Sequence, residues 1–538
     1  MIMSSEISNE AITILLVTLP YLLRRREAKN SKIRSFEAFP YGLLSVASYV
    51  QRGSARPVNI KIIDCNVHGE DEYLGVIRNC LDECRPDIVG LSMMFDNSYI
   101  YLESITRMVK NFDDSVLLVL GGAAASFSWE VILAEQEYLD AICYAEGELP
   151  FLKLVNADDR RAFLDEDPSW ATRKSMQAGK KPQASFIVDL NEVIDIDYSL
   201  VDNDSYRMRE AFSPFLQEDG AQKRQYFLVS SRGCPYRCVF CSNSSIHGKQ
   251  IRYADVEHVV EHVARLVSDY GMNILTIYDD QLLSNAARAK QLFRELARFD
   301  LRIECPNGLS VAFIDEEMAL LMKRAGVDTV ALAIESGSEQ MIRQVIHKPL
   351  KLEMVKPVVQ LLRRHGLFVE GFFVNGLPGE RDEHRKETLE FIKDVELDWS
   401  GFSLAAPFRG SPLYDICVRN GYIDSGLKLG DVVLDKYIIT TPDSDPEHVT
   451  RETYLMNLDV NFVNNYRMKS GDYEVAANCF RDVIRRYDGH AFAYYFLARA
   501  LEQMACDRNL MMDAERRFEE IVACDPAWNE YAQHFELI

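Results

Sequence analysis

Short apolar runs alternate with amphipathic helical stretches in two long blocks of this chain, and this alternation constrains the fold more than any other feature. In the first block the apolar runs cover residues 12–18, 58–64, 88–92, 116–120 and 141–144. Helical patterns such as 41–52, 72–83 and 99–111 lie between them. Strands separated by helices form parallel βαβ units. We therefore expect an α/β domain with a doubly wound, Rossmann-like sheet over residues 1–155.

The second block, residues 223–425, repeats the alternation. Its candidate strands cover residues 226–230, 274–278, 301–304, 329–334, 368–374 and 401–405. Six β/α units are too few for the common eight-fold barrel. They predict a partial (β/α)6 barrel that is open on one side.

The remaining segments differ from these blocks. Residues 156–222 are charged, weakly periodic and interrupted by Pro168, Pro182 and Pro214, so we expect a linker with little regular structure. Residues 426–538 become mostly helical from about residue 452. Phe480 and Phe518 occupy equivalent positions in two similar helices 38 residues apart, which suggests two imperfect tetratricopeptide-like repeats of 34 residues. The alternative is a plain helical cap on the barrel.

Composition narrows the class of protein. The net charge of −22, from 60 basic and 82 acidic residues, argues against a nucleic-acid-binding surface. No stretch approaches the roughly 20 apolar residues that span a bilayer. Residues 11–19 are apolar but lack the preceding basic residues and the cleavage site of a signal peptide, so we expect a cytoplasmic protein. Close cysteine spacing in a reducing compartment indicates metal binding or catalysis.

Three cysteines form the most informative motif. Cys234, Cys238 and Cys241 have C-x3-C-x2-C spacing in a loop between a strand and a helix. Three thiolates can hold one face of a [4Fe–4S] cluster and leave the fourth iron open to an exogenous ligand. A zinc site would normally show a fourth Cys or His nearby, and the nearest, His247, lies in the following polar loop. Unliganded core cysteines are the other alternative. The sequence disfavours both the zinc site and unliganded cysteines.

This motif, with the barrel that follows it, resembles the signature of the radical S-adenosylmethionine (SAM) superfamily. The resemblance implies that the open iron binds SAM and that reductive cleavage yields a 5′-deoxyadenosyl radical. It also implies an electron donor such as flavodoxin or ferredoxin. The positions that match the family's SAM contacts at successive strand ends are Tyr278, Asp279, Asn307, Glu335, Ser336 and Gly376.

The first domain resembles the cobalamin-binding domain of one large radical SAM subclass, the class B methyltransferases. The matching small residues that would contact the corrin and its nucleotide tail are Ser92, Gly121, Gly122 and Gly147. Residues 20–40, which follow the first strand, contain no histidine, so the resemblance implies base-off cobalamin without a histidine ligand. His68 is expected to be a surface loop residue. The alternative is a degenerate flavodoxin-like domain without a cofactor.

Together these features predict a cobalamin-dependent radical SAM enzyme that modifies an unactivated carbon, with C-methylation as the leading reaction. A non-methylating deoxygenation, cyclisation or rearrangement is the alternative. The substrate is expected to be a small molecule, or a peptide or carrier-bound group held by the helical tail. The catalytic residues are not identified by the sequence.

Overall fold

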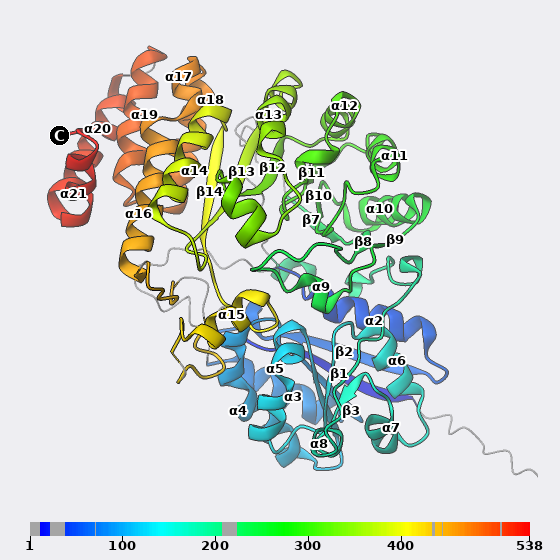
Figure 1. Cartoon of the computed structure of the whole chain (residues 1–538). Helices are drawn as coiled ribbons and strands as arrows, with labels where there is room; N and C mark the ends of the chain where they lie inside the picture. Colours follow the sequence, from blue (N-terminus) through cyan, green and yellow to red (C-terminus); the bar gives the residue numbers. More distant parts are fainter. Residues whose placement is uncertain are drawn as a thin grey trace, which may run out of the picture.

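The computed structural model describes residues 11–21, 38–69, 71–206, 223–424, 426–432, 436–443, 445–505 and 508–538. An N-terminal α/β domain lies below a partial barrel, and a group of helices stands beside the last barrel strand (Figure 1). The expected fold class is therefore confirmed. None of the described helices combines the length and the apolar composition needed to cross a membrane.

The N-terminal domain is built on one sheet with the strand order β2-β1-β3-β4-β5-β6. Its strands are β1 (Ile12–Thr18), β2 (Val58–Asp64), β3 (Ile88–Ser92), β4 (Leu117–Gly121), β5 (Ala141–Cys143) and β6 (Trp170–Ala171). Its helices are α2 (Tyr41–Gly53), α3 (Tyr73–Cys84), α4 (Tyr99–Phe112), α5 (Ala123–Glu135), α6 (Glu148–Asn156), α7 (Arg160–Glu166) and α8 (Arg173–Gln177). All described pairs are parallel except β5 with β6.

The apolar run of β1 explains why both faces of this sheet are covered. Leu15 and Val17 pack into a core with α3, α4 and α5, whereas Ile14 and Leu16 pack into a second core with α2 and α6. A strand that is buried on both faces needs a continuous apolar run rather than an alternating one. The expected doubly wound sheet is confirmed.

The segment 156–206 corrects one prediction. It carries α7, α8 and the edge strand β6 instead of little regular structure, and Trp170 is buried in the N-terminal core. Further along, Ile187, Leu190 and Tyr198 are buried in the barrel core. Residues 207–222 of the expected linker lie outside the described part of the chain. The described connection is thus packed structure, because its scattered apolar residues find partners in both domains.

Two three-stranded parallel sheets, β11-β10-β7 and β12-β13-β14, form the wall of the barrel. The strands are β7 (Gln225–Leu228), β10 (Ile274–Ile277), β11 (Arg302–Glu304), β12 (Thr329–Glu335), β13 (Phe368–Asn375) and β14 (Trp399–Leu404). Single bridges, Ile303 to Val327 and Leu309 to Leu332, join the two halves. The expected partial (β/α)6 barrel is confirmed.

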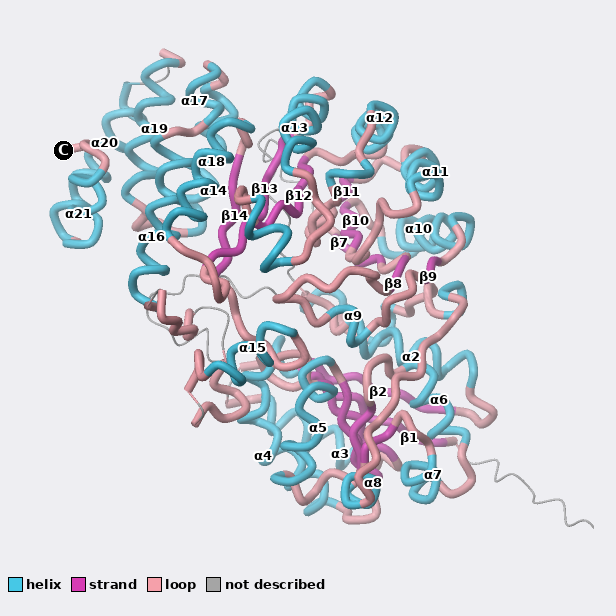
Figure 2. Tube along the Cα trace, in the orientation of Figure 1, coloured by secondary structure: helices cyan, strands magenta, loops and turns pink. Residues whose placement is uncertain are grey.

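Helices cover the outside of these strands (Figure 2). They are α10 (Val256–Tyr270), α11 (Ala286–Leu296), α12 (Glu316–Arg324), α13 (Val355–Arg364) and α14 (Asp382–Val395), with a π-helix at Met341–Ile346. The short β8 (Ser231–Arg232), β9 (Arg252–Tyr253) and α9 (Asn243–Ile246), together with α15 (Pro412–Asn420), complete the barrel segment. Helices α9 and α15 lie between the barrel and the N-terminal domain (Figure 1).

The C-terminal helices cover the exposed edge of β14. They are α16 (Pro446–Leu458), a π-helix at Asp459–Val463, α17 (Tyr466–Ser470), α18 (Tyr473–Arg486), α19 (Ala491–Gln503), α20 (Arg508–Cys524) and α21 (Pro526–His534). The Asn461 amide accepts from the backbone N–H of Ser400 and donates to its carbonyl, both at 2.8 Å. This satisfies an edge that would otherwise offer unpaired backbone groups.

Candidate active site

The three cysteines lie in one loop whose two ends are held together by the antiparallel pair of β8 and β9. Gly233 turns the chain at a φ of +100°, and a Cβ there would lie 2.3 Å from the carbonyl oxygen of Gln250. Only glycine fits such a position. The backbone N–H of Cys234 then donates to the carbonyl of Gly248 at 3.1 Å. The triad therefore begins at a fixed turn between the barrel and the N-terminal domain.

The thiols of Cys234, Cys238 and Cys241 are free and half-buried. Burial raises the pKa of all three thiols, that of Cys238 to about 12, and a bound metal would favour their thiolate forms. N–H groups of Gln281 and Asn243 already point at two of the sulfurs, at 3.4 and 3.5 Å. Such donors accompany cluster-bound thiolates.

The cysteine loop supplies three thiols as candidate metal ligands. Among the described residues no three Cys, His, Asp or Glu side chains are grouped as they would be around a single metal ion. A cubane takes each thiolate on a different iron and therefore needs a wider set of ligands. The donor set fits a [4Fe–4S] cluster.

Two carboxylates that follow β10 accept hydrogen bonds from the start of the cluster loop. The buried carboxylate of Asp279 accepts from the Ser230 N–H at 2.5 Å and from the hydroxyls of Ser230 and Ser231 at 2.7 Å. Asp280 accepts from the Gly233 N–H at 3.3 Å. The family resemblance implies that Asp279 contacts SAM. In the structure its carboxylate instead accepts hydrogen bonds from Ser230 and Ser231, which lead into the loop.

Glu335 and a lysine form an ion pair beside the triad. Glu335 ends β12 at a φ of +75°, where the register with β13 shifts. Its Oε1 accepts from Lys348 Nζ at 2.7 Å, and both side chains are largely buried. Lys348 also lies close enough to Cys238 to lower the pKa of that thiol, against the larger opposite effect of burial. The pair therefore places one carboxylate and one ammonium next to the expected cluster.

The other expected SAM contacts lie at neighbouring strand ends with partners of their own. Asn307 donates to the carbonyl of Tyr278 at 2.8 Å, and the Ser336 hydroxyl lies 3.2 Å from that of Thr388. Gly376 has a φ of +85°, and a Cβ there would lie 2.7 Å from the ring of Tyr437. The close approach that requires glycine at 376 is therefore made by Tyr437.

The small residues of the N-terminal domain meet at the carboxyl edge of its sheet. Ser92 and Gly121 are register partners at the ends of β3 and β4. Gly122 and Gly147 stand at the N-termini of α5 and α6. Gly122 is required by a close contact with the Met93 carbonyl, whereas a Cβ at Gly121 would lie 3.8 Å from the Cβ of Cys143, an ordinary packing distance.

Buried hydroxyls without partners lie at the same edge. Thr18 ends β1, Ser98 follows β3 and Ser128 lies in α5. All three are at least 95% buried, and their hydroxyl oxygens have no hydrogen-bond partner among the described residues. Buried polar groups are normally paired. These three hydroxyl oxygens are enclosed by the domain itself, so they do not line a ligand site.

His68 follows the 3₁₀ turn Cys65–Val67 and is half-buried. Residues 22–37, most of the histidine-free segment after β1, lie outside the described part of the chain.

Comparison with known families agrees with both sites. Residues 228–392 match the family model of the Radical SAM superfamily, and residues 34–155 match that of the B12 binding domain. The chain belongs to the cobalamin-binding radical SAM enzymes.

Three relatives illustrate the range of this group. An uncharacterized methyltransferase of Pyrococcus horikoshii is 28% identical over 71% of this chain and 79% of its own length. The cytidylyl-2-hydroxyethylphosphonate methyltransferase of Streptomyces wedmorensis is 27% identical over 79% of this chain and 86% of its own. An anaerobic magnesium-protoporphyrin IX monomethyl ester cyclase of Rubrivivax gelatinosus is 26% identical over 80% and 73%.

Solved structures share the fold. The radical SAM methyltransferase TsrM of Kitasatospora setae, with cobalamin and a [4Fe–4S] cluster bound, matches with a TM-score of 0.61 and 15% identity over 84% of this chain and 90% of its own. The cobalamin-dependent radical SAM enzyme OxsB, with aqua-cobalamin and SAM bound, matches with a TM-score of 0.56 and 16% identity over 98% and 82%.

The sequence did not reveal the partners of several charged residues of this radical SAM enzyme. Glu146, Glu148, Arg232 and Arg252 join its two sites, and Lys348 pairs with Glu335 beside the triad. Nothing in a linear pattern identifies these partners. His247, weighed from the sequence as a zinc ligand, lies 2.9 Å from Glu146 through its Nδ1.

Proposed function

We propose that this radical SAM enzyme is a cobalamin-dependent methyltransferase that acts on an unactivated carbon. The observation that carries the proposal is the contact between the cysteine loop and the carboxyl edge of the N-terminal sheet. The loop of the three free cysteines and the loop after β5 are joined by direct hydrogen bonds between Glu148 and Arg232 and between Glu146 and Arg252. Two adjacent cofactor sites supply the proximity that radical formation and methyl transfer require.

When bound, a [4Fe–4S] cluster would supply the electron for the reductive cleavage of SAM, and cobalamin would serve as the methyl carrier. The chain's own residues bind and orient these groups. Cys234, Cys238 and Cys241 hold the cluster, and Glu335 with Lys348 binds the polar groups of SAM. Asp279 positions the cluster loop rather than SAM. Tyr278, Asn307, Ser336 and Gly376 remain proposed for the walls of the SAM site.

Cobalamin is proposed to bind base-off, with its tail along Ser92, Gly121, Gly122 and Gly147. No histidine occurs between residues 20 and 40 to ligate cobalt from the loop after β1. His68→Ala should leave the absorption spectrum of the bound cobalamin unchanged. A shift toward a five-coordinate spectrum would instead identify His68 as a lower ligand.

A second candidate is a non-methylating radical reaction. A cyclase is nearly as similar to this chain as the methyltransferases are, at 26% identity over 80% of the chain. The partners proposed for either reaction are an electron donor such as flavodoxin or ferredoxin, and a small-molecule, peptide or carrier-bound substrate.

The test is an anaerobic incubation of the reconstituted full chain with SAM and a chemical reductant. Formation of both 5′-deoxyadenosine and S-adenosylhomocysteine supports the methyltransferase, because only methyl transfer leaves S-adenosylhomocysteine. Formation of 5′-deoxyadenosine alone from cobalamin-loaded protein supports the second candidate. Absence of both products from protein that carries iron and cobalamin contradicts the proposed function.

A further inference from the structure

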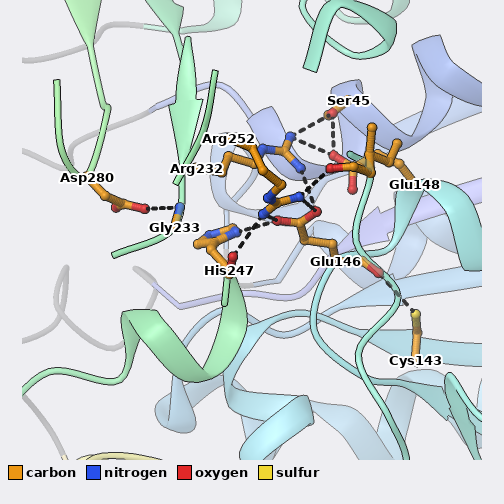
Figure 3. A network of polar contacts seen from close by, with 10 residues as sticks. Ser45, Cys143, Glu146, Glu148, Arg232, Gly233, His247, Arg252 and Asp280 are labelled. Atoms are coloured by element: carbon orange, nitrogen blue, oxygen red, sulfur yellow. Dashed lines mark hydrogen bonds and ion pairs between the residues drawn. The ribbon is translucent and has the colours of Figure 1, made fainter. Parts of the chain in front are cut away.

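A buried network of charged side chains joins the two cofactor loops (Figure 3). On the N-terminal side, Glu146 and Glu148 flank Gly147 in the loop after β5. On the barrel side, Arg232 in β8 and Arg252 in β9 stand at the two ends of the cluster loop. The two strands pair with each other, so both arginines point from one rigid ladder toward the two glutamates.

The hydrogen bonds of this network fix the orientation of its arginine side chains. Arg252 donates through Nη2 to Oε1 of Glu146 at 2.6 Å and through Nη1 to Oε2 at 3.0 Å. Arg232 Nη2 donates to Oε1 of Glu148 at 2.7 Å, and the same oxygen accepts from the Ser45 hydroxyl at 2.6 Å. Two-pronged arginine–carboxylate contacts fix orientation as well as distance.

The ion pairs of the network are shielded from water, but burial also means that they add little to the stability of the fold. At most 8% of each glutamate or arginine side chain is exposed. Charges removed from water lose hydration that their mutual attraction barely replaces, so well-packed apolar side chains would serve stability as well. A role in geometry explains the network better than a role in stability does.

The residues of the network lie next to each proposed cofactor site along the chain. Arg232 precedes the Gly233 turn, and Cys234 follows it directly. Glu148 is the first residue of α6, directly after Gly147 at the proposed cobalamin edge. Glu146 also holds the far part of the cluster loop, because the carbonyl of its partner His247 accepts from Arg252 at 2.9 Å. A displacement of either glutamate would therefore move a cofactor-bearing loop.

We propose that Glu146, Glu148, Arg232 and Arg252 are positioning residues that fix the separation between the cobalamin and the cluster. This inference rests on the proposed function, because it requires both cofactors to bind. It assigns the four residues no contact with SAM or substrate. They act through the backbone of the Gly147 and Gly233 loops.

The test uses the double variant Glu148→Leu/Arg232→Met in the full, reconstituted chain. It removes one positive and one negative charge together and leaves the Glu146–Arg252 pair neutral overall. The single variant Glu148→Leu leaves Arg232 without its closest partner and should lower the melting temperature. The double variant should recover most of that loss, because no unpaired charge remains. The matched control is Glu192→Gln, which removes a carboxylate that faces α2 outside the network.

The decisive measurement is the magnetic dipolar coupling between the reduced cluster and cob(II)alamin, followed by electron paramagnetic resonance. Wild type and Glu192→Gln should give one narrow distance distribution. The double variant should lose that single narrow peak while it keeps normal iron and cobalamin contents. An unchanged distribution in the double variant would overturn the inference and leave the network a structural contact only.

Failure of the proposed function is recognised separately. Wild-type protein that loads iron but no cobalamin overturns both the function and this inference before any variant is compared. Should the double variant not fold, Arg232→Met alone replaces it, since it removes the donor to Glu148 and leaves that carboxylate its contact with the Ser45 hydroxyl. A distribution like that of wild type in this variant counts equally against the inference.

Discussion

Removal of the Glu335 carboxylate should weaken SAM binding without loss of the cluster. In the structure Lys348 is the one described donor to this carboxylate, so the group can still accept from a bound ligand. A lost charge-assisted hydrogen bond costs about 1.5–3 kcal/mol. We therefore expect Glu335→Gln to raise the SAM dissociation constant about 10- to 150-fold. The iron content and the cluster spectrum should remain those of wild type.

Backbone strain provides a matched control. A residue other than glycine at a positive φ costs roughly 1–2 kcal/mol in the left-handed region. Glu335→Gly removes the carboxylate and also relieves the φ of +75°, so its stability should suffer less than that of Glu335→Gln. Both variants should nevertheless lose SAM affinity to a similar extent.

The assay is calorimetric titration of anaerobically reconstituted protein with SAM, beside a thermal melt of each variant. Lys348→Met tests the other half of the pair. The reasoning is refuted if SAM affinity stays within twofold of wild type while Glu335→Gln and Lys348→Met both lower the melting temperature. In that case the ion pair would only brace the end of β12.

Three further predictions follow from the geometry. Cys234→Ala, Cys238→Ala and Cys241→Ala should each abolish iron loading, whereas Cys84→Ala, at a similarly half-buried thiol outside the loop, should load normally; iron analysis after reconstitution checks this. Burial alone would raise the pKa of Glu146, but hydrogen bonds from Arg252 and His247 outweigh it and lower that pKa to about 2, below its ordinary 4.5. The resulting stability is fully present above pH 4.5 and is lost as the pH falls toward 2, so urea melts should show a larger advantage of wild type over Glu146→Gln at pH 6 than at pH 3. Removal of residues 446–538 should give aggregated protein, because it exposes the β14 edge that Asn461 covers; monomeric, cluster-loaded protein on size-exclusion chromatography would contradict this.

Much of the fold was predictable because its signals are local. The strands at 12–18, 58–64 and 88–92 were predicted with their observed ends. The first and third are apolar runs, and the second starts as an alternation of apolar and polar residues. The connection 156–206 was not predictable in the same way. Its few apolar residues, such as Trp170 and Tyr198, have no period and acquire a role only when two separate cores accept them.

Sequence by itself determined the cluster loop, because all three thiols lie within eight residues and no distant partner is needed to bring them together. It also placed Asp279 and Glu335 at strand ends. Only the tertiary structure decided what these carboxylates contact: Asp279 accepts from Ser230 and Ser231, and Glu335 accepts from Lys348. The contact of Glu148 with Arg232 joins residues 84 positions apart in two domains. Such pairs depend on how the domains pack. The linear sequence does not show which partner a buried charged residue will have in the folded chain.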